Sequence, residues 1–178
     1  MITIELIKNL NYILGIGGLV GILVTAILLF DLKTKKALTF VVEKWGTLLA
    51  LLATFGSSVM TLVYSEIFGF IPCGLCWLER IMLYPQILIL GTGIYFKDRL
   101  MPRYGIVLSV LGLIISLYHH YLQMGGNQFI KCPAAGVGAD CAKRFFFEFG
   151  FMTFPLMSAI LFAFLIVLYV YLLKLNTK

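Results

Sequence analysis

Residues 12–30 read YILGIGGLVGILVTAILLF, nineteen positions without a charged side chain. About 20 consecutive apolar residues are enough to cross the hydrocarbon core of a bilayer as a helix. A secretory signal peptide is the alternative, but its apolar region is only about 7–15 residues long and a small-residue cleavage site follows it. The run in this chain is longer and ends in LLFDLKTKK. We therefore expect a retained transmembrane helix.

Four further apolar runs follow the first, and the composition of the chain agrees with them. Hydrophobic residues make up 61% of the sequence and charged residues only 12%, whereas a soluble domain carries about 25% charged residues. Each span must be helical, because lipid satisfies no backbone hydrogen bond. We expect an all-α, polytopic membrane protein with five spans, at residues 12–30, 45–64, 77–96, 104–122 and 149–173.

The basic residues between these runs predict how the chain is oriented. Nine Lys and Arg residues lie in segments 31–44, 97–103 and the C-terminal tail, and five lie on the other side. Cytoplasmic segments are the richer in Lys and Arg, so we expect the N-terminus outside and the C-terminus in the cytoplasm. All four cysteines then lie outside, where disulfides form and persist. The net charge of +6 does not indicate a nucleic-acid partner, because the basic residues form no patch with interleaved aromatics.

The first two cysteines, Cys73 and Cys76, have CxxC spacing at the start of the third span. This spacing favours reversible redox chemistry, because a helix N-terminus stabilises a thiolate. Arg80 follows four residues after Cys76 on the same helical face, so we expect a lowered pKa at Cys76. Two alternatives are a structural disulfide, which would stabilise little across so short a loop, and a zinc site that also uses Cys132 and Cys141, whose spacing is unusual for zinc.

The other two cysteines, Cys132 and Cys141, lie in the loop before the last span. Four cysteines allow three disulfide connectivities. As a pair, Cys132 and Cys141 could form a purely structural disulfide that closes their loop. Beside a CxxC on the same side of the membrane, they also form a candidate relay, because thiolate attack on a disulfide moves electrons between pairs through a mixed disulfide. A loop pair can reach a soluble partner, and a pair at the membrane edge can reach a lipid-soluble quinone.

Three blocks of the sequence carry a family resemblance. PCGLCWLERIMLYP at 72–85, YHHYLQ at 118–123 and CAKRFFFEFGFMTFP at 141–155 together resemble the DsbB family of thiol:quinone oxidoreductases, including its shorter BdbC branch. The CxxC lies between two spans and the loop pair precedes the last span, as in that family. Vitamin K epoxide reductase is similar too, but there the loop pair comes first, so its order fits less well.

The resemblance implies a four-helix bundle in the bacterial plasma membrane. The family reoxidises a soluble, DsbA-like thiol oxidase of the thioredoxin fold and passes the electrons to ubiquinone or menaquinone, with no metal. By this resemblance Cys73 and Cys76 form the disulfide next to the quinone, which Cys76 contacts and Arg80 supports. Cys132 and Cys141 form the disulfide that faces the partner, and Cys132 makes the mixed disulfide with it.

The histidines of YHHYLQ and the acidic residue of the CxxC block receive different expectations. The resemblance matches His120 with the family position near the quinone, whereas His119 matches no family position. For Glu79 we favour a structural role, in which it holds Arg80 or the start of its helix, over a role in catalysis.

The chain departs from the family in its number of spans. The family has four, so we divide the chain into an extra N-terminal transmembrane helix with a basic cytoplasmic linker at 1–44 and a four-helix redox domain at 45–178. The competing interpretation is a non-enzymatic membrane scaffold or transporter subunit in which the cysteines form structural disulfides.

Overall fold

The computed structural model describes residues 2–34, 38–132 and 140–176, and within these ranges the protein is helical. The helices are α1 (Ile2–Thr34), α2 (Thr39–Leu62), α3 (Gly74–Phe96), α4 (Met101–Gln123) and α5 (Phe154–Asn176). A five-residue π-helical turn, η1 (Val63–Ile67), continues α2. The described residues contain no strand, only an isolated bridge between Glu148 and Met152. The all-α prediction is confirmed.

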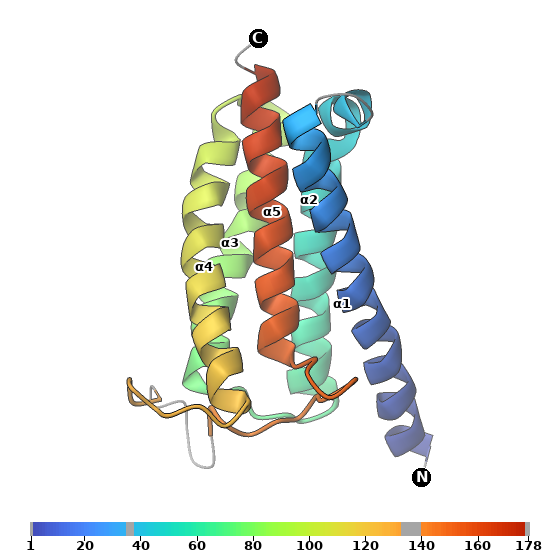
Figure 1. The fold of residues 1–178 in the computed structure, drawn as a ribbon, viewed down its shortest axis with the longest axis vertical. Coiled ribbons are helices and arrows are strands. Elements are labelled where there is room, and N and C mark those ends of the chain that lie inside the picture. The colour runs from blue at the N-terminus through green and yellow to red at the C-terminus, as the bar shows by residue number, and fades with distance from the viewer. Residues whose placement is uncertain (1, 35–37, 133–139, 177–178) are drawn as a thin grey trace.

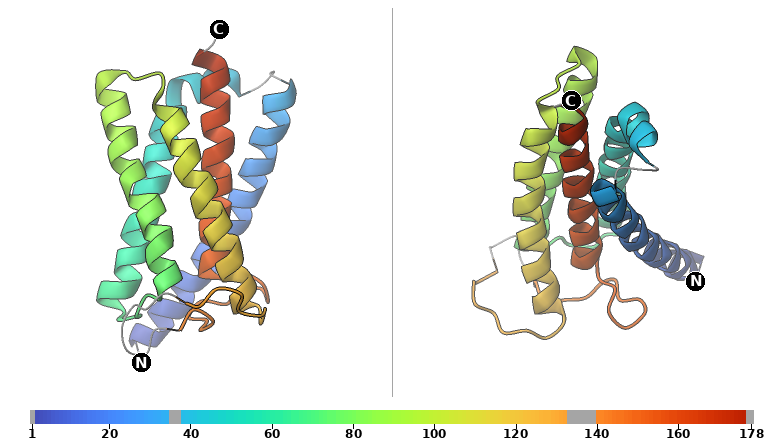
Figure 2. Two further views of the ribbon diagram at one scale, coloured as in Figure 1. Left: turned by 90° about the vertical axis from the view of Figure 1, so that its left-hand side faces the viewer. Right: turned by 45° about the horizontal axis from the view of Figure 1, so that its top comes forward.

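Four of the helices close into a bundle, and α1 lies outside it. Contacts run from α2 to α3, from α3 to α4, from α4 to α5 and from α5 back to α2, and α1 packs along α5 (Figure 1). The N-terminus of α1, the start of α3 and the long loop before α5 lie at one end of the molecule, and the C-terminus lies at the other, as Figure 2 also shows. Both cysteine-bearing segments are therefore at the same end.

Small residues on α4 let it approach α5 closely. A Cβ atom added at Gly105 would collide with the ring of Tyr169, and one added at Gly112 would collide with the ring of Phe162. Tyr169 and Phe162 are fully buried in the main apolar core. Helices in membranes associate through such close packing, because lipid supplies no hydrophobic drive between them.

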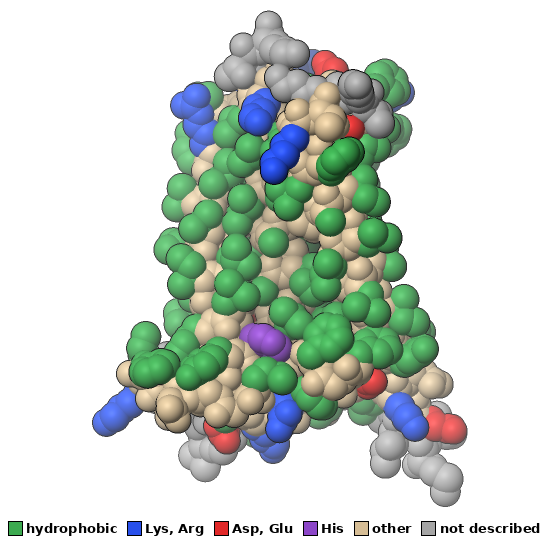
Figure 3. Space-filling model, viewed as in Figure 1, with side chains coloured by type: hydrophobic (Ala, Val, Ile, Leu, Met, Phe, Trp, Pro, Cys, Tyr) green, Lys and Arg blue, Asp and Glu red, His purple; other side chains and the backbone are tan. Residues whose placement is uncertain are grey.

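Four helices are long and apolar enough to span a membrane by length and composition, within the described residues: 5–34, 39–67, 101–123 and 154–175. The remaining predicted span, 77–96, which is the third in the chain, corresponds to α3, which is not among these four helices. Charged and polar side chains in α3, such as Glu79, Arg80 and Gln86, lower its hydropathy. Side chains along the flank of the bundle are mostly hydrophobic and Lys and Arg lie toward its two ends (Figure 3). The span at α3 and the orientation remain predictions, and Lys35, Lys36 and Lys178, which the orientation partly used, lie outside the described residues.

The predicted start of the last span is wrong by five residues. The sequence indicated a helix from Phe149, but α5 begins at Phe154. Phe149 and Gly150 have positive φ angles of 55° and 77°, which a right-handed helix does not allow. They form the tip of a turn that the Glu148–Met152 bridge closes, so an apolar run continues here without a continuous helix.

Candidate active site

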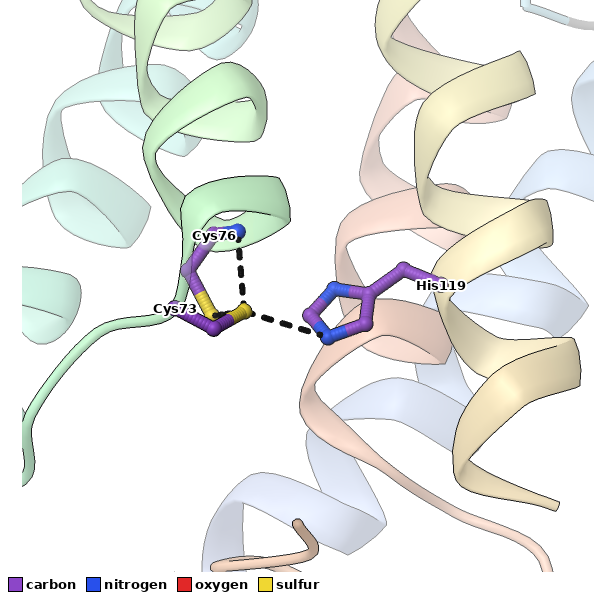
Figure 4. A group of neighbouring side chains, drawn as sticks. All are labelled: Cys73, Cys76 and His119. Atoms are coloured by element: carbon purple, nitrogen blue, oxygen red, sulfur yellow. Dashed lines mark hydrogen bonds between the residues drawn. The ribbon is translucent and has the colours of Figure 1, made fainter. Parts of the chain in front are cut away.

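The CxxC cysteines come together at the N-terminus of α3. Cys73 is the N-cap residue, with extended backbone angles, and its Sγ accepts a hydrogen bond from the backbone N–H of Cys76, at 3.3 Å. The two Sγ atoms are 2.9 Å apart, and both residues carry free thiols (Figure 4). Residues three apart on a helix face the same side, so this spacing places the sulfurs in position to form and break a disulfide.

His119, from the last turn of α4, faces the cysteine pair. Its Nε2 atom lies 3.5 Å from Cys73 Sγ and 3.1 Å from the carbonyl oxygen of Cys141, and its Nδ1 atom lies 2.7 Å from Glu79 Oε1. His119 is 1% exposed and Glu79 is 8% exposed. A carbonyl only accepts hydrogen bonds, so a proton on Nε2 would satisfy the contact with Cys141, and a proton on Nδ1 would satisfy the contact with the Glu79 carboxylate. Gln123 Nε2 also contacts His119 Nε2, at 3.4 Å. The arrangement fits an imidazolium between two negative groups, the Glu79 carboxylate and a Cys73 thiolate.

The thiolate of this pair is stabilised at Cys73. Hydrogen bonding from the Cys76 thiol, which is the main cause, and from His119 lowers the pKa of Cys73 to about 4, although burial opposes the shift. The prediction named Cys76 as the stabilised thiolate, and the structure corrects this. A free amide of the first helical turn, that of Cys76, donates to the N-cap sulfur of Cys73, and Arg80 directs Nη2 to the carbonyl oxygen of Thr61, at 2.7 Å. Neither feature therefore acts mainly on Cys76.

A cavity of about 650 Å³ opens beside the site, with Cys76, Glu79 and Arg80 among its lining residues. The rest of the lining is mostly apolar and comes from α1, α2, η1, the segment before α3, α3 itself, the loop before α5, and α5. This volume is in the usual range for a small-molecule site of about 300–1,000 Å³. Of the two CxxC cysteines, Cys76 is among the lining residues and Cys73 is not.

Arg80 is buried in this wall. It is 7% exposed, and its guanidinium lies 5.2 Å from the centre of the Trp77 ring. Glu79 was expected to hold Arg80 or the helix start, but its carboxylate bonds His119 instead. Arg80 is therefore a charged residue of the cavity wall, and its guanidinium also donates a hydrogen bond to the carbonyl oxygen of Thr61.

The loop cysteines lie on the His119 side of the site. The structure joins Cys132 and Cys141 by a disulfide, with their Cα atoms 6.0 Å apart. Cys141 is buried in the same small apolar cluster as Cys73, and Cys132 packs against this cluster. A disulfide between Cys73 and Cys76 remains a prediction.

His120, which the resemblance placed near the quinone, faces elsewhere. Its Nδ1 atom bonds Thr153 Oγ1 at 2.8 Å, and His120 does not line the cavity. The functional histidine candidate is His119, one residue earlier. The two are adjacent, and a difference of one residue turns a side chain by about 100° around a helix axis.

The two CxxC cysteines and His119 could also be considered as ligands of a metal ion. Ligand atoms of Cys73, Cys76 and His119 lie within 4.8 Å of one another. Two thiolates bound to one tetrahedral zinc lie roughly 3.8 Å apart, given Zn–S bonds of about 2.3 Å. The observed 2.9 Å between the sulfurs is shorter and suits a redox dithiol better than a zinc site.

Comparisons with known proteins agree with this geometry. The family model for disulfide bond formation protein DsbB matches residues 43–172. The chain is 42% identical over 123 residues to the SPbeta prophage-derived disulfide bond formation protein B of Bacillus subtilis, covering 68% of this chain and 80% of that protein. It is 36% identical over 140 residues to disulfide bond formation protein C of the same organism, covering 79% and 96%.

A third relative comes from another genus. The probable disulfide formation protein of Oceanobacillus iheyensis is 35% identical over 142 residues, covering 79% of this chain and 93% of that protein. No solved structure matches the chain. The family match covers most of the chain and includes every residue of the CxxC site, so the resemblance seen in the sequence is confirmed. The chain belongs to the DsbB family of disulfide bond formation proteins and is a membrane oxidoreductase.

Proposed function

We propose that this protein is a thiol:quinone oxidoreductase that reoxidises an extracytoplasmic, DsbA-like thiol oxidase and reduces a membrane quinone. The observation that carries the proposal is the different surroundings of the two CxxC sulfurs. Cys76 lines an apolar cavity of about 650 Å³, whereas Cys73 faces His119 and lies in the same cluster as Cys141 of the loop disulfide. These surroundings support Cys76 as the cysteine that meets a lipid-soluble acceptor and Cys73 as the one that exchanges with a thiol donor.

The proposal includes five spans, with the site at the extracytoplasmic surface of the plasma membrane. α3 has 23 residues, which gives a helix of about 34 Å, long enough to cross the hydrocarbon core. It packs between α2 and α4, which are both long and apolar enough to span. Neighbouring helices can satisfy its polar groups: Gln86 Oε1 accepts hydrogen bonds from Ser109 and from Tyr169 of the adjoining helices.

The proposed reaction moves two electrons through two disulfides. A thiolate of the reduced partner attacks Cys132 of the Cys132–Cys141 disulfide, and resolution of this mixed disulfide leaves the partner oxidised and the loop pair reduced. The loop dithiol then reduces a Cys73–Cys76 disulfide by the same exchange. Reoxidation of the Cys73–Cys76 dithiol releases two electrons and two protons, which a quinone takes up to become a quinol.

Residues around the cavity suit a quinone head group. The buried Arg80 guanidinium supplies positive charge where the ring oxygens would gain electron density, and the apolar lining suits the ring and its tail. On the other side of the pair, His119 and Glu79 stabilise the thiolate form of Cys73. Cys73 is then the better leaving group when a mixed disulfide between Cys73 and the loop pair is resolved.

Quinone reduction in detergent tests the proposal. Purified protein is mixed with a reduced thioredoxin-fold dithiol and either a ubiquinone or a menaquinone analogue, and the ultraviolet absorbance of the quinone is followed. We expect turnover with wild type and none with Cys76→Ser. Turnover by Cys76→Ser at the wild-type rate, or none by wild type with either quinone, contradicts the proposal.

A thiol-trapping assay separates the competing interpretation. In a scaffold or transporter subunit with structural disulfides, the cysteines would keep one redox state when the donor and then the quinone are added. In a relay, all four cysteines become reduced by the donor and are reoxidised on addition of the quinone.

A further inference from the structure

The helix α1 lies outside the residues that the family model matches, yet it contributes to the site. Leu14 of α1 lines the cavity together with Cys76 and Arg80, whereas the family match begins at residue 43. We propose that α1 is a wall of the quinone site that sets the affinity for the quinone tail, and not a separate anchor. This inference rests on the proposed function and names a positioning role within it.

A hydrogen bond fixes α1 to the cavity from the extracytoplasmic half of the helix. The Tyr64 hydroxyl donates to Asn11 Oδ1 at 2.5 Å, and Tyr64 is itself a buried lining residue. The Tyr64 ring makes an edge contact with Phe154, another lining residue, with ring centres 4.6 Å apart. An amide side chain is costly in an apolar setting unless it is hydrogen-bonded, so the bond between Asn11 and Tyr64 holds this part of α1 in a defined register against the cavity.

Two glycines next to Leu14 let α1 pack closely against the turn before α5 and against α5 itself. A Cβ at Gly15 would lie 2.8 Å from the ring of Phe149, and a Cβ at Gly18 would lie 3.0 Å from Met152. The Gly18 position also faces the side chain of Met157, which lines the cavity. The closeness of this packing places Leu14, one turn earlier on α1, at the cavity.

The far end of α1 is also fastened to the bundle. Asp31 Oδ2 accepts hydrogen bonds from the Tyr171 hydroxyl of α5 at 2.6 Å and from the backbone N–H of Leu38 at 3.2 Å. Since both ends of α1 are held, α1 is a fixed wall in the structure.

The cavity is open to the bilayer on the side of α2. Its lining includes Leu52 and Phe55, which are 58% and 55% exposed, whereas Leu14 is partly buried on the α1 side. A polyisoprenoid tail leaving the cavity would therefore pass between α1 and α2, with Leu14 as a contact close to the ring. The ligand class that fits is a quinone with an isoprenoid tail.

A larger side chain at Leu14, which would occupy part of the cavity beside α1, tests this inference. Leu14→Trp is compared with Leu23→Trp, a matched substitution on α1 at a residue that is 60% exposed and does not line the cavity. We expect Leu14→Trp to raise the KM for a long-tailed quinone at least about tenfold, the effect of roughly 1.4 kcal/mol, with kcat unchanged within about twofold. Leu23→Trp should keep the wild-type KM.

Two further variants keep the test decisive if Leu14→Trp does not fold. Leu14→Ala removes wall contacts and should raise the same KM by a smaller factor. Asn11→Leu removes the bond to Tyr64 and should raise it about fivefold, the effect of one net hydrogen bond. Exchange between the partner and the loop disulfide, followed by thiol trapping without quinone, should be unchanged in all of them.

The outcomes separate this inference from the proposed function. If wild type reduces quinone and the Leu14 and Asn11 variants keep its KM, α1 is no part of the quinone site and only the inference fails. If wild type reduces no quinone, the proposed function itself fails.

Discussion

Replacing Cys76 with alanine should raise the pKa of Cys73, because the Cys76 thiol is the main source of stabilisation of the Cys73 thiolate. A hydrogen bond to a charged group contributes about 1.5–3 kcal/mol, and one pKa unit corresponds to about 1.36 kcal/mol. The loss of this bond corresponds to about one to two pKa units, and the lowered pKa of Cys73 should rise accordingly in the alanine variant.

The matched variant is Cys76→Ser, whose hydroxyl can still donate to the Cys73 sulfur. Both variants are made in a Cys132→Ser/Cys141→Ser background, so that Cys73 is the only thiol and its ionisation is followed by the ultraviolet absorbance of the thiolate. We expect the pKa of Cys73 in the serine variant to lie about one unit or more below that in the alanine variant.

The sign of the effect on stability follows from the lowered pKa. The folded state favours the Cys73 thiolate, so the stabilisation is complete above the ordinary thiol pKa of 9.0 and is lost as the pH falls through about 4. The reasoning is refuted if Cys73 has the same pKa in the alanine and serine variants, or if it titrates near its ordinary value in both.

Three other substitutions test separate features. His119→Ala should slow exchange between the loop disulfide and the CxxC pair about tenfold or more at pH 5, because one charge-assisted hydrogen bond is lost. His120→Ala should leave this exchange rate unchanged. Rapid acid quench followed by thiol trapping measures the rate in both variants. Gly112→Ala should lower the thermal stability in detergent, because the new Cβ meets a buried phenylalanine ring, while Gly91→Ala, which meets no neighbour, should be neutral or stabilise by up to about 1 kcal/mol. Tyr171→Phe should destabilise the fold by about 1–3 kcal/mol in a denaturation assay, because the carboxylate at the end of α1 loses its shorter hydrogen bond.

The helices could largely be predicted because apolar runs of this length have one stable solution in lipid. Their ends were less predictable. α1 continues from Ile2 to Thr34, well beyond the uncharged run at 12–30, because polar residues extend a helix past the hydrocarbon core without penalty. At Phe149 the apolar pattern continues but Gly150 and the bridge of Glu148 with Met152 form a turn, and hydropathy does not distinguish an apolar turn from a helix.

The spacing of small residues along α4 already distinguishes His119 from His120 in the sequence, although the family resemblance did not. The buried face of α4 includes Gly105, Ser109, Gly112 and Ser116, spaced alternately four and three residues apart, as one helical face requires. Continuing this spacing leads to His119, and His120 falls off the face. The resemblance selected His120 because it compares positions in a block and does not consider which face of the helix is buried.

The location of the thiolate could not be predicted from the CxxC spacing. Either cysteine of such a pair can lie near a helix N-terminus, and only the helix boundary decides which one caps it. Here α3 begins at Gly74, three residues earlier than the predicted span, so Cys73 becomes the N-cap residue and Cys76 moves into the first turn. A change of one turn in the helix start exchanges the roles of the two sulfurs.

The π-helical turn η1 has a consequence for how this protein tolerates changes in length. In η1 the backbone N–H of Phe68 bonds the carbonyl oxygen of Val63, five residues back, at 3.1 Å, so the turn holds one residue more than an α-helical turn would. Deleting Ser65 would let the segment revert to α-helix, and because the π-helical turn already holds the extra residue, the segments on its two sides would keep nearly the same relative orientation. A deletion in the middle of α2, by contrast, would rotate the two sides by about 100° relative to each other. We therefore expect a scan of single-residue deletions to find Ser65 more tolerant than positions inside α2.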